Sequence, residues 1–354
     1  MFDFFTYFIY LSLLTVLVFL TGYKQKLATA ELVFDTKQKL RLQHFAALLI
    51  ISFVVGFRYE VGVDWEGYRM DFEAIKNSPY LSFSYQYMEL GFFYINKIIA
   101  QIGLSYPWMF FTVALITWYF FFKSIPNFLL PLFIFFLFVD EYFFWGMNGV
   151  RQFAAMSIWM LATRYIITKN IKKYILLLLL ASLFHRSVLI LLPFFFIPYY
   201  RLYKKYLWIG LFVFSLIIGS SNTFIGYIES ITIYLDQKIE IVGLYVRYID
   251  SNRLVIDKET QLGLGFLFKT MLNLFVILIS GNVIKKHPKT TVYFILFFMG
   301  AILFNLSYNI QLLGRINNYF LIIRSVVLAI SAWHFLQIPK YRIFIVGFCV
   351  DNPV

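Results

Sequence analysis

The chain is 354 residues long, 61% hydrophobic and only 14% charged, and its formal net charge is +13. A soluble domain of this size needs far more charged surface, so the composition predicts an integral membrane protein. In such a protein an excess of Lys and Arg marks cytoplasmic loops that contact anionic membrane lipid, and we expect no nucleic-acid partner. The single cysteine, Cys349, excludes an intramolecular disulfide. The four histidines lack ligand spacing, so we expect no metal.

Apolar runs follow one another along the chain, and a membrane-spanning helix needs about 20 mostly apolar residues. The first run has no basic start and no small-residue cleavage site, so we expect a retained helix rather than a signal peptide. No linker or internal repeat divides the chain, which favours a single membrane domain over residues 1–354. The runs lie near residues 3–23, 43–57, 106–122, 127–145, 149–168, 206–220, 263–284, 290–308 and 316–336.

Two further segments are less regular. Residues 89–103 are only amphipathic, and residues 174–198 are interrupted by His185, Arg186 and Ser187. The basic loops fall consistently on the cytoplasmic side only if 89–103 does not cross and 174–198 leaves and returns on one side. We therefore expect an all-α, polytopic membrane protein with about 10–12 transmembrane or partly inserted helices. One of them would be a broken or re-entrant segment near 174–198.

This topology leaves two large extracytoplasmic loops, 58–88 and 221–262. It also places Arg58, Arg151, Arg186 and Arg315 at or near the outer face, where positive charge is unfavoured. An anionic ligand such as a diphosphate would explain them, since the guanidinium fork binds phosphate oxygens bidentately. Pairing with loop carboxylates, or snorkelling, is the alternative. Arg324 lies about 13 Å deeper and should face the interior or a cavity.

Further polar residues lie next to these arginines. Asp64 stands at the membrane surface beside Trp65 and Tyr68, which either stack on sugar rings or simply line the interface. Asn148 is a candidate N-cap for the helix whose first turn would hold Arg151 and Gln152 and would attract an anion.

His185 lies within an apolar run beside Arg186. It is either a hydrogen-bonded packing residue or, since polar groups in membranes are usually functional, a general base. The sequence contains no Walker loop, no dinucleotide-binding glycine motif, no HExxH and no GxSxG, so no cofactor is expected.

Several of these residues form an ordered series that resembles the EpsG family. The series is Arg58, Val61–Gly62–Val63–Asp64, Tyr68, Phe72, Glu89–Leu90–Gly91–Phe92, Asn148, Arg151–Gln152, Phe184–His185, Ser187 and Pro193. The family comprises polytopic proteins of exopolysaccharide and capsule clusters, similar to Wzy-type repeat-unit polymerases.

The resemblance implies polymerisation of undecaprenyl-diphosphate-linked oligosaccharides at the outer face of the bacterial cytoplasmic membrane, without a metal. Other polysaccharide assembly proteins are possible partners. Catalysis would use His185 or Asp64 as base, and sugar binding or support would come from Trp65, Tyr68, Glu89, Asn148 and Gln152. The diphosphate would be bound by Arg58, Arg151 and Arg315, with Arg186 and Arg324 as further candidates.

Three other functions fit the same residues. A flippase for the lipid-linked sugar would use a cationic cavity too, although such transporters often contain internal repeats. A polysaccharide O-acyltransferase would need a histidine reachable from the cytoplasm. A non-enzymatic scaffold would tolerate single arginine substitutions.

Overall fold

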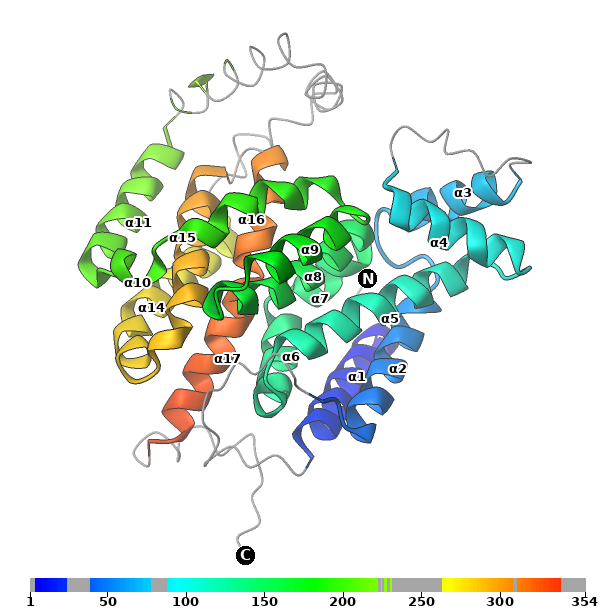
Figure 1. Cartoon of the computed structure of the whole chain (residues 1–354), viewed down its shortest axis with the longest axis horizontal. Helices are drawn as coiled ribbons and strands as arrows, with labels where there is room; N and C mark the ends of the chain where they lie inside the picture. The colour runs from blue at the N-terminus through cyan, green and yellow to red at the C-terminus, as the bar shows by residue number, and fades with distance from the viewer. Residues whose placement is uncertain are drawn as a thin grey trace, which may run out of the picture. The chain divides into compact units, whose positions relative to one another are not determined.

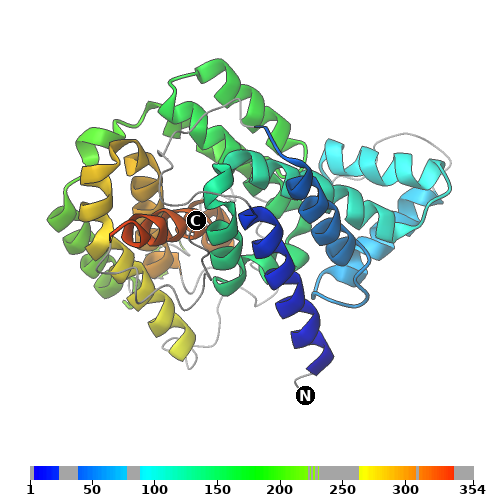
Figure 2. The same cartoon turned by 90° about the horizontal axis from the view of Figure 1, so that it is seen from below.

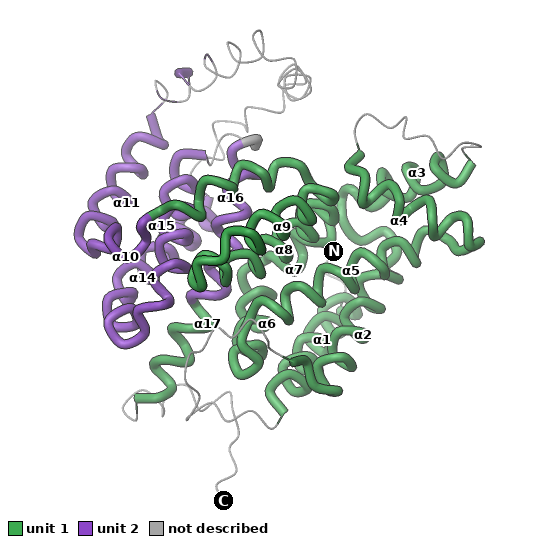
Figure 3. The backbone as a smooth tube through the Cα atoms, viewed as in Figure 1, with its two compact units in different colours: residues 1–197, 328–354 green, residues 198–327 purple. Residues whose placement is uncertain are grey.

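A computed structural model describes residues 4–23, 39–77, 88–221, 224, 226, 227, 230, 263–307 and 311–338. All regular elements among these residues are helices (Figure 1), which confirms the predicted all-α class. The chain divides into two compact units, residues 1–197 with 328–354 and residues 198–327 (Figure 3). Most of the predicted loop 221–262 lies outside the described residues.

The first unit contains most of the helices. Its central helices, α5 and α8, pack on each other, and α5 also packs on α2. The approach of α2 to α5 depends on Gly56, because a Cβ there would lie 2.5 Å from the Phe111 Cα. The elements are α1 (Phe4–Gly22), α2 (Leu42–Gly56), α3 (Trp65–Lys76), α4 (Leu90–Gln101), α5 (Tyr106–Ser124), η1 (Asn127–Leu129), α6 (Leu130–Val139), α7 (Tyr142–Asn148), α8 (Val150–Ile167), α9 (Ile171–Ser182) and η2 (Arg186–Phe196).

The apolar run 127–145, expected as one helix, is broken. Pro126 precedes the short helix η1, and the chain turns between α5 and α6 by 111°. Glu141 then adopts a left-handed φ of 68°, which ends α6 and starts α7. Hydrophobicity alone therefore overestimated the continuity of this segment, since apolar composition does not specify where the backbone turns.

The broken segment predicted near 174–198 is confirmed. The helix α9 ends at Ser182, and the 3₁₀ helix η2 begins at Arg186 and contacts α9. The Tyr174 hydroxyl donates to the Leu191 carbonyl at 2.5 Å, and the Tyr174 and Phe195 rings lie 5.3 Å apart. The two halves thus form a hairpin whose connection contains His185.

The segment 58–88, expected as a loop, contains the helix α3. Its buried residues Trp65, Tyr68, Phe72 and Ile75 recur at helical spacing and form one apolar face. The helix α4, which packs beside α3 (Figures 1 and 2), has 12 residues and is about 18 Å long. It is too short to cross a bilayer core of about 30 Å, as expected for residues 89–103.

The second unit is built around α15 (Thr291–Ser307), in which every residue from 291 to 298 is buried. The helices α11 (Lys205–Gly219), α14 (Leu264–Lys286) and α16 (Gln311–Leu321) pack on it. The unit also contains α10 (Tyr199–Leu202), η4 (Pro288–Thr290) and the start of α17 (Ile323–Leu336).

Four helical segments among the described residues are long and apolar enough to cross a membrane, or five if α5 and the bent α6 count as one span. They are Phe4–Gly22, Leu264–Lys286, Pro288–Ser307 and Leu313–Leu336. The chain is therefore a multi-pass membrane protein.

Candidate functional site

Arg58 lies just beyond the C-terminal end of α2 and is 7% exposed. Its guanidinium donates to three backbone carbonyls, those of Val61 at 3.1 Å, Val55 at 2.5 Å and Met147 at 2.9 Å. It also lies over the Phe110 ring, 4.3 Å from the centroid. Burial lowers the pKa of Arg58 to about 10, so it stays charged at neutral pH. Arg58 therefore ties the end of α2, the following loop and α7 together.

Gly62 and Asn148 form the second connection between this loop and α7. Gly62 has a φ of 101°, and a Cβ there would lie 2.8 Å from the Asn148 Oδ1. That oxygen accepts a hydrogen bond from the Val63 amide at 2.6 Å. The expectation that Asn148 caps the next helix is wrong, because Asn148 ends α7 and Gly149 is the N-cap of α8. Its side-chain oxygen instead bonds to the loop that follows α2.

The aromatic residues after this loop are buried. Trp65 and Tyr68 are 3% and 8% exposed, and their rings pack on other aromatic rings, with Trp65 beside Tyr59 and Tyr106. Neither ring therefore presents an open face on which a sugar could stack. Their predicted role in sugar binding or support stays a prediction. Asp64, the N-cap of α3, is exposed and makes no side-chain capping bond.

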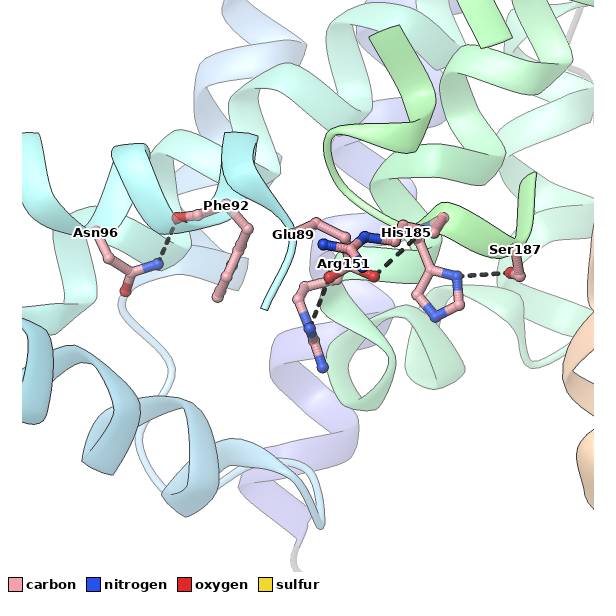
Figure 4. Close-up of polar contacts among 7 residues, drawn as sticks. Glu89, Phe92, Asn96, Arg151, His185 and Ser187 are labelled. Atoms are coloured by element: carbon pink, nitrogen blue, oxygen red, sulfur yellow. Dashed lines mark hydrogen bonds and ion pairs between the residues drawn. The ribbon is translucent and has the colours of Figure 1, made fainter. Parts of the chain in front are cut away.

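Glu89 and Arg151 form the central contact of the site (Figure 4). Arg151, in the first turn of α8, donates from Nη1 to the Glu89 Oε2 at 2.7 Å, and the two side chains are 28% and 12% exposed. The other oxygen of Glu89 accepts from the backbone N–H of Arg186 at 3.4 Å. One carboxylate thus joins α4, α8 and η2, which are far apart in the sequence.

Gly91 brings α4 to the hairpin. The amides of Gly91 and Phe92 both donate to the Leu183 carbonyl, at 2.9 and 3.3 Å. A Cβ at Gly91 would lie 2.8 Å from that oxygen, so this approach requires glycine. The Glu89–Leu90–Gly91–Phe92 sequence therefore supplies both the carboxylate and the contact that places it.

His185 lies at the connection of the hairpin, next to Arg186. Its Nδ1 is 2.6 Å from the Ser187 Oγ (Figure 4), and this contact restrains the orientation of the ring. The Arg186 side chain is exposed. Ser187 belongs to the series of residues that resembles the EpsG family, but no role was predicted for it. The structure shows that it contacts the His185 ring two residues earlier.

Asp71 is a site residue that the sequence did not single out. It lies three residues after Tyr68 on α3, so the two share a helix face. The Tyr68 hydroxyl hydrogen-bonds to Arg151. Burial raises the pKa of the Asp71 carboxyl, while the charge of Arg151 lowers it by a smaller amount. The helical spacing of the buried residues of α3 was the signal that could have placed Asp71 here.

The remaining candidates lie elsewhere or deeper. Gln152 follows Arg151 and is buried. Arg315 and Arg324 belong to the second unit, where Arg315 is exposed and Arg324 is 2% exposed. Arg324 donates to the Asn273 Oδ1 of α14 at 2.8 Å, which confirms that it faces the interior. The first unit alone therefore brings together Glu89, Arg151, Arg186, Tyr68 and Asp71.

Of three comparisons with known proteins, one gives a match. The sequence model of the EpsG family matches residues 41–350, nearly the whole chain. No curated protein and no solved structure matches. The match includes every residue of the cluster.

Proposed function

The chain belongs to the EpsG family, and we propose that it joins undecaprenyl-diphosphate-linked oligosaccharide repeat units into exopolysaccharide or capsular polysaccharide. The reaction would occur at the outer face of the bacterial cytoplasmic membrane. The observation that supports this function most is the arrangement of Arg151, Glu89 and the Arg186 amide beside His185. A lipid-linked anion needs positive charge that it can reach and polar groups beside an apolar segment. This arrangement provides both.

The proposed transfer needs a stabilised leaving group and a base. The Arg151 guanidinium and the exposed Arg186 side chain bind the diphosphate of the donor, with no metal or cofactor. A hydroxyl of the acceptor sugar loses its proton to the base, and its oxygen bonds to the anomeric carbon of the donor. The bond from that carbon to the diphosphate breaks, and the electron pair leaves with undecaprenyl diphosphate.

His185 or Asp64 is the base. When the His185 Nδ1–H donates to Ser187, the neutral Nε2 can accept the proton. Asp64 is exposed at the start of α3 and is the alternative. We assign Arg58 to holding the loop before Asp64, because three of its N–H groups are already donated to carbonyls.

Deletion of the gene followed by analysis of lipid-linked glycans tests the function. A polymerase deletion accumulates single repeat units on the lipid diphosphate. Arg151→Gln should restore at most about 1% of polymer, since losing one donor to developing charge typically costs 10²–10³ in rate. Arg69→Gln is the matched control, because Arg69 pairs with Glu66 on the exposed side of α3, and it should restore full polymer.

Other results would contradict the proposal. Repeat units trapped on the inner leaflet would indicate a flippase, and polymer of normal length without acyl groups would indicate an acyltransferase. Full polymer with Arg151→Gln would indicate a scaffold. Comparing His185→Ala with Asp64→Asn then identifies the base, because only the variant of the true base should lose transfer while still binding donor.

A further inference from the structure

Glu89 holds donors that suit an anionic ligand. Its two oxygens accept hydrogen bonds, one from the Arg151 guanidinium of α8 (Figure 4) and one from the backbone amide of Arg186 in η2. A phosphate oxygen prefers the same donors, charged guanidinium and backbone N–H groups. A diphosphate that binds Arg151 therefore competes with the Glu89 carboxylate, which already neutralises the charge of Arg151.

The carboxylate is not needed to hold α4 in place. Although Glu89 is the N-cap of α4, it makes no side-chain bond to its own helix. The start of α4 is held by the backbone bonds from Gly91 and Phe92 to Leu183. The contact of Glu89 with Arg151 is thus separable from the local fold.

The pair is also shielded enough to affect binding. The Glu89 side chain is 12% exposed, whereas both partners of the Glu66–Arg69 pair on α3 are more than a third exposed. Ion pairs on an exposed surface contribute little, while shielded and hydrogen-bonded pairs interact more strongly. An anion that binds Arg151 must first separate this pair, and the free energy of separating it lowers the apparent affinity of the anion.

We infer that Glu89 is an internal counter-anion that a diphosphate displaces from Arg151, so that it selects for ligands of high negative charge. This inference rests on the proposed diphosphate site. A weakly charged anion does not compensate for the lost ion pair, whereas a diphosphate brings several charges and can bind the guanidinium bidentately. The apparent dissociation constant is the intrinsic one divided by the fraction of sites in which Glu89 is displaced.

Titration of the purified full-length protein with inorganic diphosphate in metal-free buffer tests this inference. Glu89→Gln keeps the size of the side chain and an oxygen for the Arg186 amide, but removes the charge. It should lower the apparent Kd for diphosphate roughly tenfold, a coupling of ordinary size. The matched control, Glu66→Gln, removes a carboxylate from an arginine outside the site and should leave the Kd unchanged.

The outcomes are distinct. Folded Glu89→Gln that binds diphosphate equally or more weakly would overturn the inference, because a merely structural carboxylate gives no gain in affinity. If that variant does not fold, Glu89→Asp carries the same test, since its shorter carboxylate cannot reach Arg151 as well. Failure of both to fold would make Glu89 structural and overturn it too. If the wild type binds no diphosphate, or Arg151→Gln binds it equally well, the proposed diphosphate site itself fails.

Discussion

Arg58 and Arg151 come from the same sequence pattern, yet the structure uses them differently. Arg58 is almost fully buried and donates to three carbonyls of its own chain. Arg151 is partly exposed, and its partners include the side chains of Glu89 and Tyr68. A carbonyl held in the backbone cannot be exchanged for a ligand, whereas a carboxylate side chain can. The chemistry of an arginine's partners therefore says more about ligand binding than its position in the sequence.

The largest stability effect should distinguish these two arginines. Arg58→Ala removes the donor of three carbonyls and one stacked contact, which should cost about 2–4 kcal/mol of stability. We expect the Tm in detergent to fall by roughly 3–5 °C for a chain of this length. Arg151→Gln should lower the Tm by clearly less, because one charged partner of Glu89 is lost rather than three bonds to backbone carbonyls, and the glutamine amide can still donate to Glu89. A thermal melt followed by tryptophan fluorescence measures both.

An equal Tm for both variants would remove the distinction. In that case Arg58 would be as exchangeable as Arg151, and its assignment to the loop would fail. Lowered polymer yield with Arg58→Ala should follow the amount of folded protein, whereas the loss with Arg151→Gln should not.

The loop that Arg58 holds offers a second test on the backbone. Gly62→Ala places a Cβ at a φ of 101° and 2.8 Å from the Asn148 Oδ1, so we expect a loss of about 1–3 kcal/mol. Gly67→Ala is the matched control, because Gly67 lies in α3 with no atom within 4 Å of its Cβ position. It should stabilise the protein by about 0.5–1 kcal/mol, since alanine favours helix. Equal melting of the two variants would show that the loop does not depend on contact with α7.

The sequence predicted the helical membrane class and the broken hairpin, because both depend on hydrophobic length and on the charges of short loops. It did not predict the partners of the site residues. Arg58 reaches a carbonyl 89 residues away, and Asn148 binds an amide 85 residues away. The preference of asparagine for N-cap positions predicted a helix cap for Asn148, but its side chain bonds to the distant Val63 amide instead.

Unlike these long-range contacts, the helix α3 could have been predicted, because its apolar residues recur at helical spacing in the sequence. Trp65, Tyr68, Phe72 and Ile75 recur at helical spacing, but the acidic residues and tyrosines of the segment suggested a loop. Recognising that period would have placed Asp71 on the face of Tyr68. The contact of that face with Arg151 still required the fold, because α3 and α8 are separated by several helices in the chain.

The smallest effect concerns the contact between Tyr68 and Arg151. Tyr68→Phe keeps the ring contacts with Phe92 and Phe110 but removes the hydroxyl that bonds to Arg151. A single hydrogen bond contributes about 0.5–1.5 kcal/mol, so polymer formation should fall by roughly two- to tenfold with little change in Tm. Tyr94→Phe, at a half-exposed tyrosine of α4, controls for the loss of a hydroxyl as such and should have no effect. If both variants behave as wild type, the Tyr68 hydroxyl does not position Arg151, and the site is smaller than the contacts around α3 indicate.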